Sequence, residues 1–363
     1  MARYVSPREL DWTLTGIVLA ICTLGILQIY SATRDTVWQG VYYRQVIYVL
    51  IGVGLMWLMA QIDYHLLLNR VPMLYLIALA GLLIIFVIGE ARFGARRWIP
   101  VVWGFNFQVS EFVKLVLVLL VARYFSEVRG DSVSGTDLLK IGGLVGVPML
   151  LVMKQPDLGT ALSYLPIVGA GILGAGVRWK YLAVLAVVGL LVLPAGWHFL
   201  KPYQKERLLT FVEPARDPQG SGYQLIQSRI AVGSGGLWGK GIAKGSQTQL
   251  RFLPVPHTDF IFSAYAEEHG FTGVLLALAL YFVVLLRMIY NAQTASDRAG
   301  SYICLCVCLL LLFHLLVNVG MVIGRMPVTG IPLPFMSYGG SSTLTIFLLL
   351  GLVHSVRVRR FVN

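Results

Sequence analysis

Asp259 is the residue whose surroundings best suit acid–base chemistry. It follows His257 and Thr258 and precedes Phe260, at the point where a polar loop meets an apolar run. A carboxylate half out of water can have its pKa raised, as removal of a proton from a hydroxyl group at neutral pH would favour. The alternative is that Asp259 only caps a short helix over 260–268, which its side chain suits well.

Several other ionisable residues surround Asp259 within the segment 249–270. They are Arg251, His257, Glu267, Glu268 and His269, in a chain that is only 13% charged. Ionisable groups are costly at a membrane boundary, so such a cluster is a functional-site hypothesis. Glu267 and Glu268 could be ligands or simply a solvated helix end. The two histidines lack the spacing of a zinc-binding pair, so no zinc site is predicted.

A second candidate site lies in the apolar run over 110–127. Glu111 and Lys114 are three residues apart, which places them on one face of a helix. An unpaired charge inside a membrane would cost a few kcal/mol, so we expect both to face the bundle interior or a wet cavity. Arg96 and Arg97 lie just upstream, and the combination predicts an outward-facing pocket with anion-binding capacity. The alternative is an ion pair that only fixes helix packing.

The segment 326–342 contains three prolines and three glycines between two apolar runs. Irregular backbone at membrane depth is tolerated only where it is buried in protein or lines a wet cavity. Ser337 and Ser341 could offer hydroxyls to an anion near a helix N-terminus, together with backbone N–H groups. A packing loop without a ligand is an equal alternative.

The composition indicates an all-α polytopic membrane protein with a single domain over 1–363. The chain is 57% hydrophobic, whereas a soluble domain would carry about twice its charged fraction. The four cysteines all lie in apolar runs, which favours small apolar residues over disulfides or metal ligands. About ten apolar segments approach the roughly 20 residues that a spanning helix needs. They are 12–31, 44–62, 72–89, 110–127, 138–153, 158–176, 180–200, 270–292, 299–323 and 337–356; Pro156 could instead kink the fifth and sixth into one element.

The distribution of Lys and Arg predicts that both termini are cytoplasmic, because the short connections on that side carry most of them. The large loop 201–257 between spans seven and eight is then extracytoplasmic. It carries eight basic and three acidic residues, a net charge of 8 − 3 = +5. This excess suggests an anionic partner, although a solvated or headgroup-bound loop is the alternative.

Two features of that loop bear on its structure and ligands. Residues 222–231 have a partly apolar helical pattern, which predicts a short helix on the outer surface. The glycine-rich run 233–241 lacks the spacing of a phosphate loop, so no nucleotide site is predicted.

Six motifs resemble the SEDS family (shape, elongation, division and sporulation), and more closely its elongation branch than its division branch. Residue Val109 departs from the proline that many members carry before Ser-Glu. The motifs are GARRW (94–98), SEFVKL (110–115), KQPDLGTA (154–161), SRIAVGSGGLWGKG (228–241), FLPVPHTDFIFSAYAEE (252–268) and GIPLPFMSYGGSS (330–342).

The resemblance implies a peptidoglycan glycosyltransferase of the bacterial cytoplasmic (inner) membrane that polymerises lipid II. Asp259 matches the essential aspartate of the family and would be the general base. Glu111 and Lys114 match polar residues of its central cavity. Substrate binding is further assigned to residues in the same motifs, namely Arg96, Arg97, Lys154, Asp157, Arg229, His257, Thr258, Ser337 and Ser341.

The resemblance also implies ligands and partners. Arginines, Lys114 or a divalent cation such as Mg²⁺ or Mn²⁺ could assist the pyrophosphate leaving group. No organic cofactor or nucleic acid is expected; membrane lipids and a class B penicillin-binding protein are. A lipid II flippase, a division-type polymerase and a scaffold for a partner synthase are the alternatives.

Overall fold

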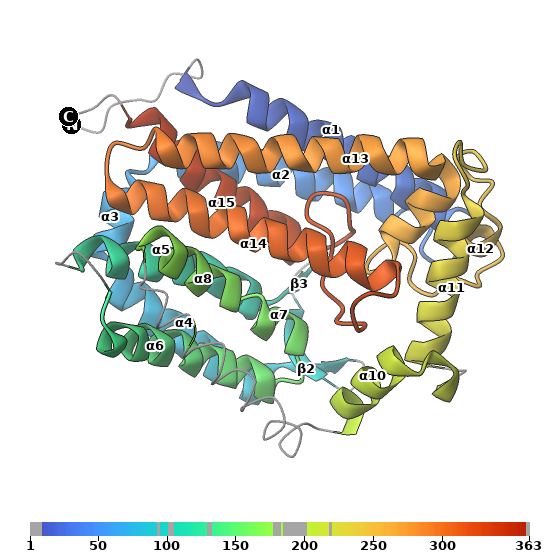
Figure 1. The fold of residues 1–363 in the computed structure, drawn as a ribbon, viewed down its shortest axis with the longest axis horizontal. Helices are drawn as coiled ribbons and strands as arrows, with labels where there is room; N and C mark the ends of the chain where they lie inside the picture. Colours follow the sequence, from blue (N-terminus) through green and yellow to red (C-terminus); the bar gives the residue numbers. More distant parts are fainter. Residues whose placement is uncertain are drawn as a thin grey trace.

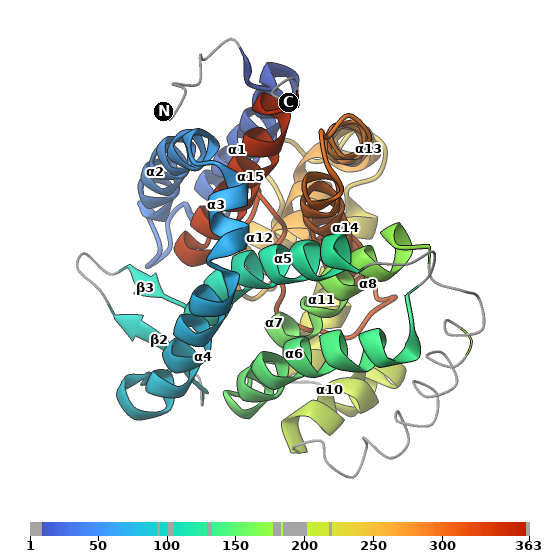
Figure 2. The ribbon, with the colours of Figure 1, turned by 90° about the vertical axis from the view of Figure 1, so that its left-hand side faces the viewer.

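The computed structural model describes residues 9–92, 95–100, 105–128, 133–176, 183, 202–217 and 220–360. Long helices run side by side along the molecule (Figure 1). Viewed along them, α1, α2, α13 and α15 form one group and α4, α6 and α8 another, with α5 and α14 between (Figure 2). The long helices are α1 (Trp12–Thr33), α2 (Val41–Gln61), α4 (Val71–Ile88), α5 (Val109–Glu127), α6 (Gly135–Lys154), α13 (Ile261–Gln293), α14 (Arg298–Val322) and α15 (Gly340–Val358).

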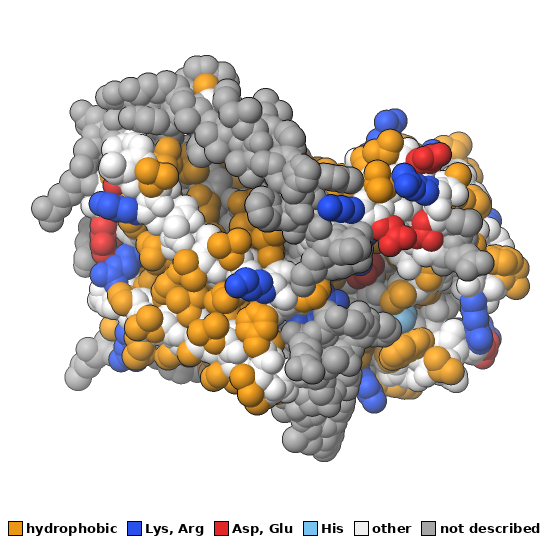
Figure 3. Space-filling model, turned by 90° about the horizontal axis from the view of Figure 1, so that it is seen from below, with side chains coloured by type: hydrophobic (Ala, Val, Ile, Leu, Met, Phe, Trp, Pro, Cys, Tyr) orange, Lys and Arg blue, Asp and Glu red, His pale blue; other side chains and the backbone are white. Residues whose placement is uncertain are grey.

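The predicted all-α polytopic membrane architecture is confirmed. Seven of the described helices are long and apolar enough to cross a membrane: α1, α2, α4, α6, α13, α14 and α15. Helix α5 covers the predicted span 110–127 but carries four charged residues. On the face seen from below, charged side chains gather mainly toward the two ends, and the middle is largely apolar (Figure 3).

The number of spans stays a prediction. The predicted sixth span is divided into two short helices, α7 (Leu158–Leu162) and α8 (Leu165–Gly174). The break falls where Pro166, at the start of α8, has no backbone N–H to continue a helix. Residues 180–200, predicted as the seventh span, lie outside the described residues apart from residue 183.

Two buried contacts identify the ends of the bundle. Asp11 caps α1 and forms ion pairs with Arg287 of α13 at 2.8 Å and Arg357 of α15 at 3.2 Å. We call this the terminal end, because α1 begins and α15 finishes there (Figure 1). At the opposite end, the loop end, the Ser31 hydroxyl donates to Glu268 at 2.5 Å and so joins α1 to the start of α13.

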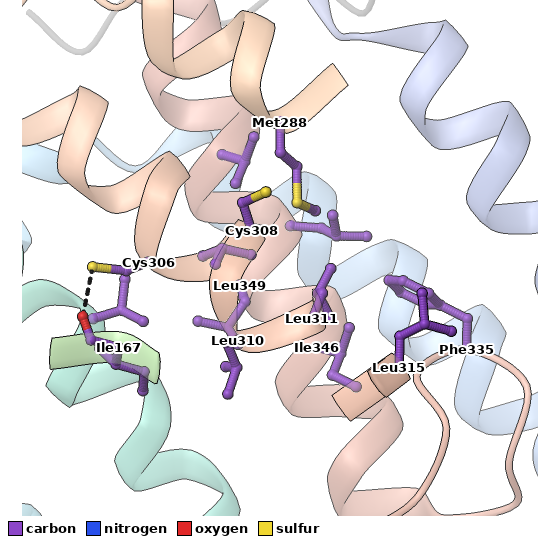
Figure 4. Close-up of a cluster of buried hydrophobic side chains, with 14 of the residues drawn as sticks. Ile167, Met288, Cys306, Cys308, Leu310, Leu311, Leu315, Phe335, Ile346 and Leu349 are labelled. Carbon is purple, nitrogen blue, oxygen red and sulfur yellow. Dashed lines mark hydrogen bonds between the residues drawn. The ribbon is translucent and has the colours of Figure 1, made fainter. Parts of the chain in front are cut away.

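Helix α14 occupies the centre of the core, where it packs against α5, α8, α13 and α15. Figure 4 shows Cys308 of α14 beside Met288 of α13, and Cys306 turned the other way, toward Ile167 of α8. The Cys306 thiol donates to the Ile167 carbonyl at 3.5 Å. All four cysteines are buried and free, as the apolar runs predicted.

The third connection forms a small antiparallel sheet at the loop end. Its strands are β1 (Glu90–Arg92), β2 (Ala95–Pro100) and β3 (Asn106–Phe107), in the order β1-β2-β3. Arg97 lies in the middle strand of this sheet, β2.

The described parts of the large loop are mostly helical. They comprise α10 (Pro202–Val212), the 3₁₀ turn η3 (Pro214–Arg216), α11 (Ser221–Ser234) and α12 (Ser246–Gln249), while α3 (Tyr64–Asn69) is a short helix at the terminal end. Helix α11 confirms the helix predicted over 222–231.

The glycine-rich run 233–241 fills a break in α13. At Gly270 the backbone leaves the helical region, with φ 64° and ψ −167°, which frees hydrogen-bonding groups on both sides. The loop satisfies them: the Lys240 N–H donates to the Glu267 carbonyl at 3.0 Å, and the Phe271 N–H donates to the Gly236 carbonyl at 2.9 Å. Gly239 makes this approach possible, because an added Cβ would lie 2.2 Å from the Glu268 carbonyl oxygen.

Glu267 and Glu268 are neither solvated nor exposed to a ligand, because both are buried. Glu267 forms an ion pair with Lys240 at 2.8 Å and accepts hydrogen bonds from the N–H groups of Gln247 and Thr248. Glu267 therefore attaches the large loop to the start of α13, and Glu268 attaches α1 to it.

We predict that Gly239→Ala lowers the free energy of unfolding by about 1–3 kcal/mol, because φ at this position is +77° and the new Cβ would meet a carbonyl oxygen. Thermal melting in detergent would measure the change. Gly143→Ala is the matched control, since Gly143 lies in α6 and a Cβ added there would have nothing within 4 Å. Equal melting temperatures for the two variants would contradict this explanation.

Candidate active site

Three successive backbone carbonyls fix the segment that carries Asp259. The His257 carbonyl accepts from the Tyr338 N–H at 2.9 Å, and the Thr258 carbonyl accepts from the Ser337 hydroxyl at 2.7 Å. The Asp259 carbonyl accepts from the Asn318 side-chain amide, also at 2.9 Å. The segment 257–259 is therefore held by α14 and by the irregular loop that precedes α15.

The Asp259 side chain does not cap α13. The N-cap residue of that helix is Phe260, and no side chain bonds the free N–H groups there. The half-buried carboxylate instead lies against the irregular loop, since a Cβ on Gly330 would be 3.5 Å from its Oδ2 atom. The capping alternative therefore does not account for Asp259.

The electrostatic surroundings of Asp259 suit a proton acceptor. Burial raises the pKa of its carboxyl group, and the nearby charge of Asp157 raises it further. Arg97 and Arg207 oppose this effect, yet the pKa remains above its ordinary value. The raised pKa of the carboxyl group is closer to the pKa of an efficient general base at neutral pH.

Arg97 and Asp157 form the nearest charged pair. Their Nη1 and Oδ1 atoms are 3.4 Å apart, and Asp157 is buried while Arg97 remains partly accessible. Asp157 also caps α7 through the Thr160 N–H and accepts from the Gln108 amide at 2.7 Å. The arginine is thus held by an oriented carboxylate and is 28% exposed, while its Nε is buried without a hydrogen-bond partner among the described residues.

The pair Glu111–Lys114 lies deeper, on the first turns of α5. Lys114 Nζ is 2.8 Å from Glu111 Oε1, and both side chains are at most 5% exposed. The ring of His314, from α14, places its Nε2 atom 3.5 Å from the same Nζ. The expectation that this pair faces the bundle interior is met.

A polar network leads from the Arg97–Asp157 pair to the start of α5. Gln108, just before α5, donates to Asp157 through its side chain and to the Ser341 hydroxyl through its backbone N–H. The Gln108 side chain also donates to the Ser110 hydroxyl at 3.1 Å, and the Tyr164 hydroxyl donates to the Ser110 carbonyl at 2.8 Å. The network therefore ends at Ser110, the residue before Glu111.

The other candidate residues take more varied places. Ser337 and Ser341 are buried, and their hydroxyls are used within the protein: Ser337 donates to Thr258, and Ser341 donates to the Asn106 carbonyl at 2.7 Å. His257 is buried with its ring against Trp38 and Tyr338. These contacts hold the backbone around the site.

Three basic candidates lie elsewhere. Lys154 is exposed at the end of α6, and Arg229 is exposed on α11 with its Cδ atom 2.8 Å from where Gly324 would carry a Cβ. Arg96 belongs to β2, opposite Ala91, and its side chain lies outside the described residues.

Gln108, His314 and Asn318 were not predicted from the sequence. The last two lie inside the apolar run 299–323 and are buried in α14. Polar residues within a membrane span usually bond across helices, and this rule would have identified both.

The described residues do not fit a resident metal ion. No group of three or more His, Cys, Asp or Glu side chains among them could hold one. The cationic side chains that act on the Asp259 carboxyl group are those of Arg97 and Arg207.

The sequence matches the family of cell cycle proteins that includes FtsW, RodA and SpoVE, over residues 11–361. The chain therefore belongs to this family, which confirms the SEDS resemblance. It is 38% identical over 356 residues to the peptidoglycan glycosyltransferase MrdB of Escherichia coli strain K12, covering 97% of this chain and 94% of the relative. It is 35% identical to the stage V sporulation protein E of Bacillus subtilis, covering 95% and 96% of the two chains.

Solved structures agree with this membership. One chain of a peptidoglycan synthase complex superposes with a TM-score of 0.84 at 34% identity, covering 98% of this chain and 99% of the other. The rod shape determining protein RodA of Thermus thermophilus superposes with a TM-score of 0.73 at 30% identity, covering 98% of each chain.

We predict that Lys114→Met lowers the free energy of unfolding by roughly 3–5 kcal/mol, because it leaves the Glu111 carboxylate buried and unpaired. The double variant Glu111→Gln/Lys114→Met should recover most of that loss, since neither charge remains. Thermal or denaturant unfolding in detergent would measure both changes. A double variant no more stable than the single one would show that the pair is not the cause.

Proposed function

We propose that this protein is a peptidoglycan glycosyltransferase that polymerises lipid II, with Asp259 as the general base. The observation that supports this most directly is a carboxylate with a raised pKa on a fixed backbone, within electrostatic reach of Arg97. The family membership and the names of the relatives give the substrate class. The geometry alone would indicate a base beside an anion-binding group.

In the proposed reaction, Asp259 accepts the proton of the 4-hydroxyl group of the acceptor N-acetylglucosamine. The hydroxyl oxygen then forms a bond to the anomeric carbon of the donor N-acetylmuramic acid. The bond from that carbon to the undecaprenyl pyrophosphate breaks, and the leaving group retains the electron pair. Attack opposite the leaving group inverts the anomeric centre. A general base typically contributes about 10²–10⁴-fold to such a step.

Arg97 is the group that we assign to the pyrophosphate. It is partly accessible, its orientation is fixed by Asp157, and its guanidinium matches phosphate geometry. The buried Lys114 adds a second positive charge whose field is compensated by Glu111. Stabilising the negative charge that develops on a leaving group is among the largest contributions an active site can make.

A divalent cation stays a prediction for this protein. Because the described residues offer no group of three protein ligands, no step is assigned to a resident ion. Mg²⁺ or Mn²⁺ bound to the pyrophosphate of the substrate is compatible with the arrangement, since such ions often bind through few protein ligands and the substrate phosphates.

We further propose that the enzyme acts in the bacterial inner membrane during elongation and rod-shape maintenance. The motifs that resemble the elongation branch and the similarity to a rod shape determining protein support this role. FtsW proteins share 33–35% identity with the chain, and a division role is the alternative. Both termini would be cytoplasmic, and the loop end with Asp259 would face outward. The similarity to a chain of a synthase complex that joins polymerization and crosslinking supports a class B penicillin-binding protein as partner.

We predict that purified Asp259→Asn makes no glycan polymer from lipid II, while its thermal stability is unchanged or raised. Because the pKa of Asp259 is raised in the folded protein, ionisation of this carboxyl group opposes folding at any pH above its ordinary pKa of 3.8. Asparagine does not ionise, so the variant avoids this loss of stability. Gel analysis of labelled lipid II would measure the product. Asp35→Asn, an exposed aspartate at the same end, is the matched control.

The same assay separates polymerisation from transport. Wild-type protein that forms no polymer in detergent but moves lipid II across vesicles would support the flippase instead. Normal chain growth by Asp259→Asn would exclude this residue as the base.

Removing the charge of Arg97 and removing the charge of Asp157 should shift the pH dependence of activity in opposite directions. Activity needs the ionised carboxylate, so it falls as the pH drops through its raised pKa. Arg97→Gln removes a charge that lowers that pKa and should move the acidic limb to higher pH. Asp157→Asn removes a charge that raises it and should move the limb to lower pH.

Polymerisation rates measured across the pH range at saturating lipid II would test this prediction. Arg44→Gln, an exposed residue at the start of α2, should leave the limb in place. Shifts in the same direction for the Arg97 and Asp157 variants would contradict the assigned electrostatics.

A further inference from the structure

Two polar residues of α14 contact both parts of the site, and the mechanism above leaves them without a role. His314 and Asn318 are four residues apart, so they lie on one face of the helix, one turn from each other. Both are almost completely buried, at 2% and 0% exposure. Helix α14 packs against α5, which carries the Glu111–Lys114 pair. It also packs against α13, which follows Asp259 in the chain.

Asn318 connects two segments that meet at the site. Its Nδ2 group donates to the Asp259 carbonyl and to the Ile331 carbonyl, each at 2.9 Å. Ile331 adjoins Gly330, the residue whose backbone lies against the Asp259 carboxylate. One amide therefore fixes both the backbone that bears the carboxylate and the loop that confines it.

His314 acts on the other charged group. A lysine ammonium only donates hydrogen bonds, so the Nε2 atom facing Lys114 at 3.5 Å must accept. The imidazole is then neutral with its proton on Nδ1. That atom lies toward the Pro332 backbone without forming a hydrogen bond of ordinary geometry. Two acceptors, Glu111 Oε1 and His314 Nε2, thus set the direction of the Lys114 side chain.

These contacts are not what packing alone would select. Glu111 Oε2, His314 Nδ1 and Asn318 Oδ1 are buried without a hydrogen-bond partner among the described residues. Leaving a buried polar atom unsatisfied is unfavourable, and apolar side chains of similar volume would avoid that cost. Each such group therefore calls for an explanation beyond packing.

We propose that His314 and Asn318 are positioning residues of the transferase site, which hold the Lys114 ammonium and the Asp259 carboxylate in one fixed relation through a single face of α14. This inference rests on the proposed glycosyltransferase function. Neither residue needs to touch the substrate. Asn318 acts through the Asp259 segment and His314 through the charge of the buried Lys114, and a displacement of about 1 Å in a reacting group can reduce a rate by about 10²-fold.

The histidine is tested with two variants. His314→Gln keeps an acceptor at about the place of Nε2, whereas His314→Leu removes it. We expect His314→Leu to lower kcat for lipid II polymerisation by about 10- to 100-fold with KM nearly unchanged, and His314→Gln to restore most of the rate. His354→Leu is the matched control, because His354 is equally buried but lies at the terminal end beside Thr15 and Asp11.

The asparagine is tested with a readout that needs no activity. Asn318→Asp has the same shape but lacks the two N–H donors, so the segment 257–262 should open more often. Hydrogen exchange followed by mass spectrometry should then show faster exchange in peptides spanning those residues, together with a fall in kcat. His354→Leu should leave exchange in that segment at the wild-type rate.

The outcomes separate this inference from the proposed function. Wild-type kcat in His314→Leu, failed rescue by His314→Gln, or unchanged exchange in Asn318→Asp would overturn it. So would losses of activity that only follow melting temperature, as in His354→Leu. A wild-type protein that forms no polymer would instead refute the proposed function, while the exchange measurement would still decide whether Asn318 holds the Asp259 segment.

Discussion

The site depends on the way three successive carbonyl groups, those of residues 257–259, are bound by donors from elsewhere in the fold. A buried backbone oxygen without a partner is costly, so an irregular segment packed against a helical bundle must find donors within the protein. Tyr338, Ser337 and Asn318 supply them. Because the main chain carries these bonds, the Asp259 side chain remains available for chemistry. The irregular loop before α15 is therefore the support of the site, and its serine hydroxyls serve that purpose within the protein.

The charges of the site are arranged as pairs with unequal exposure. Glu111 and Lys114 are both buried, whereas Arg97 is 28% exposed beside a carboxylate that is 6% exposed. The charges of the buried pair compensate each other and neither is accessible, whereas the half-open pair presents a cation at the protein surface. Asp259 lies within reach of the latter and has no paired cation of its own, among the described residues, close enough to restore its ordinary pKa. Burial therefore has the largest effect on the pKa of Asp259, and the neighbouring charges make smaller changes to it.

Much of this arrangement was predictable from the sequence, and the exceptions have physical reasons. Apolar length located most of the long helices, and the (i, i+3) spacing located the Glu111–Lys114 pair. The same reasoning could not identify the role of Glu267, because its donors Gln247 and Thr248 come from a loop whose path depends on the glycines at 235–241. It also suggested that Ser337 and Ser341 bind an anion, because the sequence does not show whether a hydroxyl contacts a ligand or a backbone carbonyl. Asn318 was overlooked because a single amide hardly alters the hydropathy of a 25-residue helix.

The break at Gly270 has a mechanical consequence. The loop is bonded on both sides of this glycine: the N–H groups of Lys240 and Gly241 donate to the carbonyls of Glu267 and Glu268, and those of Phe271 and Thr272 donate to the carbonyls of Gly236 and Leu237. The loop therefore bridges the break and resists bending there. The direction of the first turns of α13, and with it the approach of the chain from Asp259, is set by a loop far from Asp259 in sequence as well as by the helix itself.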